Sequence, residues 1–209
     1  MQGYGCTEGM ITHMQHPFDK SQNLPGSAGY GYRHVDFKVC CLDTGKALGP
    51  NQQGELLVRG PQVMKGYFKN DEATAACLNE DGWLSTGDLS YFDEKGNLFV
   101  VDRLKELIKY KAFQVAPAEL EDTLLSHPDI VDSCVIGVPD DVAGQVPRGY
   151  IVKNGESCLT EEDVHKFLGE YLSPHKQLRG GVVFVDQLPK SASGKLLRRV
   201  LLQEYLETL

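Results

Sequence analysis

The chain has 209 residues, of which 41% are hydrophobic and 24% are charged, and these proportions are typical of a globular protein with a sizeable core. Its formal net charge of −8 argues against broad nucleic-acid binding, which requires a basic face. No apolar run approaches the roughly 20 residues that span a bilayer. Six cysteines without a C-x-x-C pair indicate free thiols in a reducing compartment.

We expect no address signal at either end of this sequence. The first 19 residues have no basic leader and no apolar stretch, which argues against a secretory signal. The last three residues are Glu207, Thr208 and Leu209, which differ from the Ser-Lys-Leu peroxisomal address. We therefore expect a cytoplasmic location. His13 and His16 lack further ligands at metal spacing and are predicted to be loop histidines.

The sequence pattern of residues 25–102 is typical of strands and turns. Strands are predicted within 36–43, 54–60 and 96–102, and a helix at 71–78. In the first strand Phe37, Val39 and Cys41 alternate with Asp36, Lys38 and Cys40, which is the period of a half-buried strand. This part is predicted to be a small β-rich, barrel-like unit.

After Asp102 helices and strands alternate. Helices are predicted at 116–127, 159–173 and 194–209, and strands at 132–140, 148–153 and 180–189. In the first helix Pro117 suits the first turn, and Leu120, Leu124 and Leu125 form one apolar stripe. Thr160 and Asp163 have capping-box spacing at the start of the second. The chain is therefore predicted to be α+β, with units at 1–102 and 103–209.

Four cations lie near the start of the last predicted helix, namely Lys190, Lys195, Arg198 and Arg199. A helix N-terminus carries partial positive charge, so Lys195 in its first turn is unfavourable unless an anion binds there. A surface turn that leads into a basic amphipathic helix explains the same residues without a ligand.

Three further stretches suggest ligand contacts, and each has a structural alternative. QGYGCTEG (2–9) places Tyr4, Thr7 and Glu8 among glycines, as a flat charged ligand would need, or as a plain glycine-rich turn would. GWLSTGDL (82–89) ends near Asp88, whose carboxylate suits two vicinal hydroxyls or its own turn. VDRLKELIKYKAFQVAPAELE (101–121) is lysine-rich, and a charged edge strand is the alternative.

Together these four stretches, in this order, resemble the adenylate-forming superfamily. That superfamily includes acyl- and aryl-CoA synthetases such as 4-coumarate–CoA ligase, and the beetle luciferases. The resemblance extends along essentially all 209 residues, including PGSAG (25–29), DTGKALGPNQQGELLVRGP (43–61) and LRGGVVFVDQLPKSASGK (178–195). An ordered set of motifs is more specific than any one of them.

The resemblance implies roles for individual residues. Gly3, Tyr4 and Gly5 match the adenine-binding segment, in which Tyr4 lies against the base. Thr7 would lie near the α-phosphate, and Glu8 would bind Mg²⁺. The remaining matches are Asp88 for the ribose hydroxyls, Arg103 for the nucleotide, Lys105 for a hinge, Lys109 and Gln114 for the adenylate, Lys111 and Ala112 for the coenzyme A tunnel, and Lys195 for catalysis of adenylation.

The implied reaction has two stages and uses ATP, Mg²⁺ and coenzyme A. A small-molecule carboxylic acid becomes an acyl- or aryl-AMP, and a thiol then displaces AMP to give a thioester. A luciferase-like adenylate oxygenase and a catalytically silent truncated protein that binds nucleotide or coenzyme A are alternatives. Some relatives are peroxisomal, but the chain's last tripeptide argues against that location.

The sequence departs from the superfamily in two places. The large N-terminal portion, with its phosphate loop, does not precede GYGCTE, so residues 1–102 are predicted to be the remnant of a larger AMP-binding domain. Residues 103–209 are then the mobile C-terminal domain, and the chain alone is expected to be inactive. Ala112 replaces the usual glycine of the KYKGFQ-like loop, which would narrow the pantetheine tunnel or strain the backbone if φ is positive there.

Overall fold

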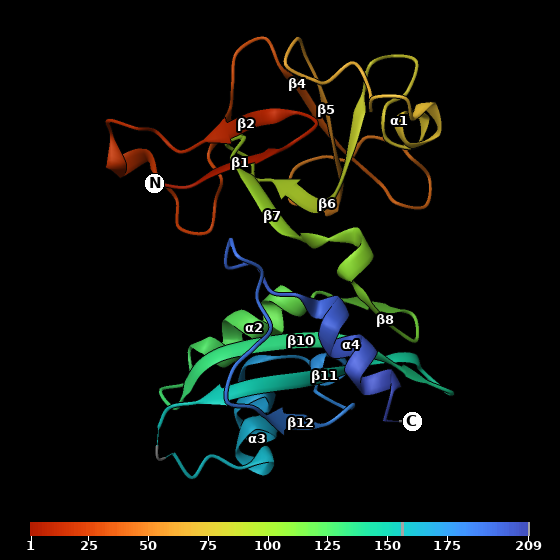
Figure 1. The fold of residues 1–209 in the computed structure, drawn as a ribbon. Coiled ribbons are helices and arrows are strands. Elements are labelled where there is room, and N and C mark those ends of the chain that lie inside the picture. Colours follow the sequence, from red (N-terminus) through yellow and green to blue (C-terminus); the bar gives the residue numbers. More distant parts are fainter. Residues whose placement is uncertain (156, 209) are drawn as a thin grey trace. The chain divides into compact units, whose positions relative to one another are not determined.

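The computed structural model describes residues 1–155 and 157–208. They form two compact units, Met1–Lys105 and Glu106–Leu209. Each unit combines helical segments with mainly antiparallel strands (Figure 1), which confirms the predicted α+β class. No helix within the described part of the chain is long and apolar enough to cross a membrane.

The first unit contains two antiparallel sheets. The larger has the order β4-β5-β6-β7 and the smaller the order β1-β2-β3. Their bounds are β1 Gly3–Cys6, β2 Met10–Met14, β3 Tyr30–Gly31, β4 Asp36–Cys40, β5 Gly54–Arg59, β6 Leu84–Phe92 and β7 Leu98–Arg103; helix α1 is Asp71–Cys77, and a 3-10 turn covers Lys20–Gln22. Within the described residues neither sheet closes on itself, so the barrel-like prediction is corrected to open sheets.

The strands of the first unit follow the sequence pattern with local exceptions. Leu56, Val58 and Leu98 are fully buried between the sheets. In β4 Val39 is buried as predicted, but Cys40 is also buried while Cys41 lies beyond the strand. The alternation of buried and exposed side chains therefore ends before Cys41, because the strand ends at Cys40.

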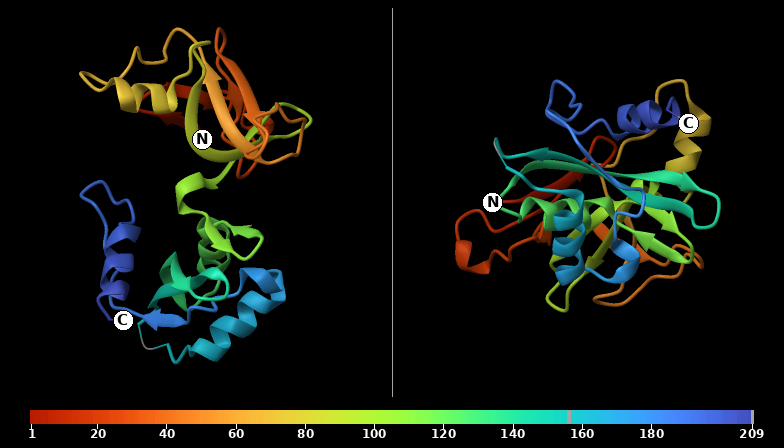
Figure 2. Two further views of the ribbon diagram at one scale, coloured as in Figure 1. Left: turned by 90° about the vertical axis from the view of Figure 1, so that its right-hand side faces the viewer. Right: turned by 90° about the horizontal axis from the view of Figure 1, so that it is seen from below.

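The second unit is built on one sheet with the order β10-β11-β8-β9, in which β12 pairs in parallel with β11. Helices α2 and α4 pack against β10 (Figures 1 and 2), and α2 also contacts α3. The bounds are β8 Ile108–Tyr110, β9 Phe113–Val115, α2 Pro117–Leu125, β10 Ile130–Asp140, β11 Gly144–Lys153, α3 Glu161–Tyr171, β12 Val182–Phe184 and α4 Arg198–Leu206, with 3-10 turns at Leu104–Glu106 and Pro174–Lys176.

Two helix starts agree with the sequence signals. Pro117 is the first residue of α2, and Thr160 and Asp163 form a complete capping box on α3. Leu120 and Leu124 are fully buried in the core of this unit. Leu125, however, is 45% exposed, so only Leu120 and Leu124 of the predicted apolar stripe face the core.

The last helix begins later than predicted. Its first residue is Arg198, and Gly194 has φ of +81°, which is incompatible with a right-handed helix. Lys195 therefore lies in a loop before α4, so the argument from a helix N-terminus does not apply to it.

His13 is a core residue of β2, which corrects its prediction as a loop histidine. Its ring is fully buried against Phe37 (centroids 4.2 Å apart) and Phe92 (5.8 Å). Nδ1 lies 3.0 Å from the Thr12 hydroxyl, and Nε2 is buried without a hydrogen-bond partner among the described residues. Burial lowers the pKa of His13 to about 4.

We expect acid to destabilise the first unit through His13. Between pH 6.5 and pH 4 the unfolded chain binds a proton that the folded ring excludes, so the free energy of unfolding falls as pH falls, by about 3 kcal/mol. Trp83 is the only tryptophan and lies in this unit, so its fluorescence during urea unfolding measures the effect. His13→Phe should flatten the pH dependence over this range; an unchanged slope in that variant would contradict the assignment.

Candidate functional site

The glycine-rich segment at residues 2–9 is a hairpin. β1 and β2 pair from Gly3–Met14 to Cys6–Met10, with an irregularity between Tyr4 and Gly5. A Cβ on Gly5 would stand 2.4 Å from the Met10 carbonyl oxygen, so the close approach of the two strands requires glycine there. The close packing of β1 against β2 thus explains the glycine at position 5. The tight turn after Cys6 contains Thr7 and Glu8.

Tyr4, Asp88 and Arg103 meet around one buried carboxylate. The Tyr4 hydroxyl donates to Oδ2 of Asp88 at 2.5 Å, and Nε of Arg103 lies 3.4 Å from Oδ1. Asp88 is only 5% exposed, whereas the Arg103 side chain is mostly solvent-accessible. Burial, and next the Asp88 bond, raise the pKa of Tyr4 far above its ordinary value, so the hydroxyl keeps its proton.

Asp88 lies within strand β6, which corrects the expectation that it belongs to a Gly-Asp turn. Asp88 and Arg103 are directly paired across β6 and β7. The Thr86 hydroxyl accepts from the Asp88 amide (3.2 Å) and donates to the Leu56 carbonyl (2.8 Å). Gly87 has φ of +72° and donates its amide to Glu55. The STGD sequence thus encodes a local distortion that fixes the carboxylate.

Glu8 is paired with a residue that the sequence reasoning missed. The Tyr67 hydroxyl donates to its Oε1 at 2.6 Å. This bond lowers the pKa of Glu8, the Arg103 charge lowers it further, and the pKa of Tyr67 rises to about 12. Fifty-nine residues separate the pair, so no local pattern could have indicated it.

The chemistry of Glu8 fits a magnesium ligand. An ionised carboxylate is the kind of oxygen donor that Mg²⁺ takes, with waters and substrate phosphates completing its coordination. No group of three or more histidine, cysteine or acidic side chains that could hold a metal occurs among the described residues. An all-protein metal cage is therefore absent from that part of the chain, whereas an ion shared with nucleotide phosphates suits one carboxylate.

In the second unit the lysine-rich stretch forms the β8–β9 hairpin. Lys109 and Gln114 are paired across it, and both are exposed, while Ile108 and Tyr110 are buried. The edge strand of the sheet is β9, which carries no charged residue, whereas Lys109 lies on β8 between β9 and β11, so the alternative interpretation of a charged edge strand does not hold. The pairing brings two predicted catalytic residues together on one surface.

Ala112 is exposed in the two-residue turn of this hairpin. The left-handed position is Lys111, with φ of +53°, and Ala112 is outside that region. The expectation of backbone strain at Ala112 is therefore wrong. Its methyl group still adds bulk at the tip of the turn, so a steric effect is the surviving part of that hypothesis.

Lys195 lies on a compact loop between Leu188 and α4. Ser191 and Lys195 are joined by a backbone bond of 2.8 Å, and the Ser191 hydroxyl accepts from the Lys195 amide at 3.1 Å. An isolated bridge pairs Lys190 with Leu196. The loop thus presents an exposed ammonium group on a short, closed hairpin.

Comparisons with known proteins place this geometry in a family. Residues 1–68 match the AMP-binding enzyme family, and residues 119–195 match the AMP-binding enzyme C-terminal domain. The two ranges make up more than half of the chain and follow the order found in the sequence analysis. The chain belongs to the adenylate-forming superfamily. The resemblance of its motifs to this superfamily is confirmed.

Individual relatives include ligases and an oxygenase. The chain is 50% identical over 203 residues to 4-coumarate–CoA ligase-like 4 of Oryza sativa subsp. japonica, which covers 97% of the chain and 37% of that protein. It is 49% identical over 195 residues to luciferin 4-monooxygenase of Photinus pyralis, covering 93% and 35%. ATP-bound MatB from Rhodopseudomonas palustris matches in structure with a TM-score of 0.90 and 33% identity, over 97% of the chain and 40% of MatB. The chain therefore spans little more than a third of its curated relatives.

Proposed function

We propose that this chain is the C-terminal portion of an acyl- or aryl-CoA ligase that uses ATP to activate a carboxylic acid. The observation that carries the proposal is the buried Asp88 carboxylate, which Tyr4 and Arg103 contact on one unit of an adenylate-forming fold. Each carboxylate oxygen has two acceptor sites, so Asp88 can accept ribose hydroxyls beside its present partners. The cytoplasmic location and the hinge at Lys105 are part of the same proposal.

In this proposal the first unit binds the nucleotide. The Tyr4 ring offers a face for adenine, Thr7 a hydroxyl for the α-phosphate, and Gly3 and Gly5 allow the strand pairing that places them. Glu8, kept ionised by Tyr67, would hold Mg²⁺, which neutralises phosphate charge when bound. Arg103 adds a cation beside the bound nucleotide.

The second unit supplies lysines to both stages. The substrate carboxylate oxygen attacks the α-phosphorus of ATP and pyrophosphate leaves, which yields the acyl-AMP. Lys195 stabilises negative charge that moves between these groups. The coenzyme A thiol, having lost its proton, then attacks the acyl carbon and AMP leaves as the anion. Lys109 and Gln114 would contact the adenylate, and Lys111 and Ala112 the pantetheine arm.

A luciferase-like oxygenase is the second candidate, favoured by the 49% identity to luciferin 4-monooxygenase. Both candidates share the first stage and differ in what consumes the adenylate. Consumption of the coenzyme A thiol supports the ligase, whereas oxygen uptake with light emission supports the oxygenase.

The test uses the longer protein that the proposal requires, together with the 209-residue chain. The longer protein is expected to catalyse acid-dependent ATP–pyrophosphate exchange and to consume coenzyme A thiol, measured with a chromogenic disulfide. The chain alone should give no exchange with any acid, because most of the carboxylate pocket would lie in the N-terminal portion. Robust exchange by the chain alone would contradict the fragment assignment, and no exchange by the longer protein would contradict the function.

Ala112→Gly is expected to raise thioester formation more than adenylate formation in the longer protein. The methyl group at the turn tip would obstruct the pantetheine arm but lies on the β8–β9 hairpin rather than among the nucleotide-binding residues. Single-turnover measurements of the two stages separate the effects. Equal changes in both stages would remove the steric explanation.

A further inference from the structure

The loop that carries Lys195 is tied to the body of the second unit at both of its ends. At its start Leu188 is buried and Lys190 contacts Asp132, and at its end Arg198 contacts Glu121. Between these points the hairpin is closed by its own bonds, including Leu197 N–H to the Pro189 carbonyl at 2.9 Å. The loop therefore behaves as one small body whose orientation depends on its attachments.

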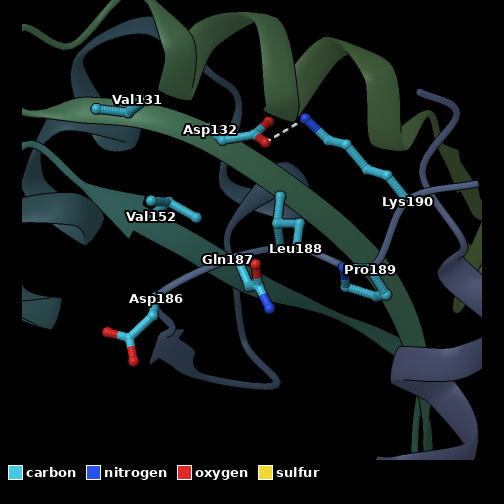
Figure 3. Close-up of a pocket in the computed structure, with 8 residues that line it drawn as sticks. All are labelled: Val131, Asp132, Val152, Asp186, Gln187, Leu188, Pro189 and Lys190. Carbon is cyan, nitrogen blue, oxygen red and sulfur yellow. Dashed lines mark hydrogen bonds and ion pairs between the residues drawn. The ribbon is translucent and has the colours of Figure 1, made fainter. Parts of the chain in front are cut away.

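Figure 3 shows the attachment at the start of the loop. Nζ of Lys190 lies 2.5 Å from Oδ2 of Asp132, across the upper part of a hollow of about 590 Å³ lined also by Val152 and Leu188. The second oxygen of Asp132 accepts from the Ser133 amide at 3.1 Å. Hydrogen bonds from Lys190 and Ser133 thus fix both oxygens of the Asp132 carboxylate.

A strand irregularity gives Asp132 its direction. The register of β10 against β11 shifts between Ile130 and Asp132, so that Val131 is skipped in the pairing and is 60% exposed. Bulges of this kind re-aim the side chains next to them. Here the bulge lies beside the residue whose carboxylate reaches Lys190, 58 positions along the chain.

The two attachments differ in what their loss would do. The Glu121 and Arg198 side chains are 10% and 22% exposed, so breaking that pair disturbs the core. The Asp132 and Lys190 side chains are 27% and 41% exposed, and pairs this exposed contribute little to folding stability. Asp132 can therefore be changed without unfolding the unit, while the start of the loop loses its ion pair and keeps only the buried Leu188 as an anchor.

We propose that Asp132 is a positioning residue for Lys195, acting through its ion pair with Lys190. It holds the 188–197 hairpin in one orientation, so that the Lys195 ammonium group arrives in a defined place. The catalytic consequence rests on the proposed function, in which Lys195 acts in adenylation. The mechanical consequence, which is the fixed orientation of the 188–197 hairpin, does not depend on the proposed function.

The mechanical consequence is tested by ¹⁵N relaxation on the 209-residue chain. In Asp132→Asn the order parameters of the amides at 191–197 should fall from about 0.85 to below about 0.6, since the hairpin then lacks the ion pair that fixes its orientation between Leu188 and Arg198. Asp186→Asn is the matched control, because Asp186 lines the same hollow and points away from Lys190 (Figure 3). Unchanged order parameters in Asp132→Asn would overturn the proposal.

The catalytic consequence is tested in the longer protein by ATP–pyrophosphate exchange. Asp132→Asn and Lys190→Met should each lower kcat about 10-fold with the KM for ATP nearly unchanged, and the double variant should be no worse than either single. Additive losses, or a fall only in thermal stability, would contradict a positioning role. If Lys195→Ala leaves exchange intact, the proposed function fails instead, and the relaxation result still decides the mechanical claim.

Discussion

Lys195→Ala in the longer protein is expected to slow adenylate formation by about 10²–10³-fold, with much less effect on the KM for ATP. A fixed ammonium group that stabilises charge only as it moves in the transition state lowers kcat rather than ground-state binding. Lys195 is exposed and closed into a short hairpin, so its removal should leave the fold intact. The measurement is ATP–pyrophosphate exchange under saturating acid.

Arg199→Ala provides the matched control for this prediction. Arg199 is an exposed cation four residues further along, in the first turn of α4, and its loss removes the same unit of charge. Exchange should remain near that of the unmodified protein. An equal loss in both variants would mean that general positive charge near the loop, rather than the placement of Lys195, supports the reaction.

The candidate site residues could be named from the sequence because the motifs that contain them are local. Tyr4 and Glu8 lie within one short segment, and Lys109 and Gln114 lie on two arms of one hairpin. The strands and helices that carry them also have local signals, such as Pro117 at the start of α2. Where the pattern within a few residues determines the structure, the prediction holds.

The partners of these residues were not predictable, because each comes from a distant part of the chain. Tyr67 reaches Glu8 across 59 positions, Tyr4 reaches Asp88 across 84, and Arg198 reaches Glu121 across 77. Sheet register decides which side chains meet over such separations, and composition does not encode it. The sequence thus indicates the candidate groups, and the fold adds the partners that hold them.

The start of α4 shows how a local signal was misjudged. The apolar spacing after Gly194 suggested a helix from that residue, but a tight turn stabilised by the Ser191 hydroxyl takes precedence. A serine side chain in such a position competes with helix formation by bonding a nearby backbone group, and Gly194 adopts the left-handed conformation that a helix excludes. As a consequence Lys195 extends from a loop and is not part of α4.

Glu121→Ala is expected to destabilise the second unit by about 3–5 kcal/mol, because it leaves a largely buried cation without its carboxylate. Oε2 of Glu121 accepts from Arg198 at 2.6 Å, and Oε1 accepts from the Val135 amide at 2.7 Å. The substitution removes both bonds and thereby loosens α2, β10 and α4 from one another. Urea unfolding followed by far-ultraviolet circular dichroism measures the loss.

Two controls separate this pair from a general effect on the chain. Trp83 fluorescence reports the first unit, whose unfolding midpoint should stay unchanged in Glu121→Ala. Glu121→Leu combined with Arg198→Met should recover much of the lost stability, since apolar side chains of similar size leave no uncompensated charge. If the double variant were as unstable as Glu121→Ala, the cost would come from the Val135 amide and from packing, and the ion pair would not be what ties α4 to the sheet.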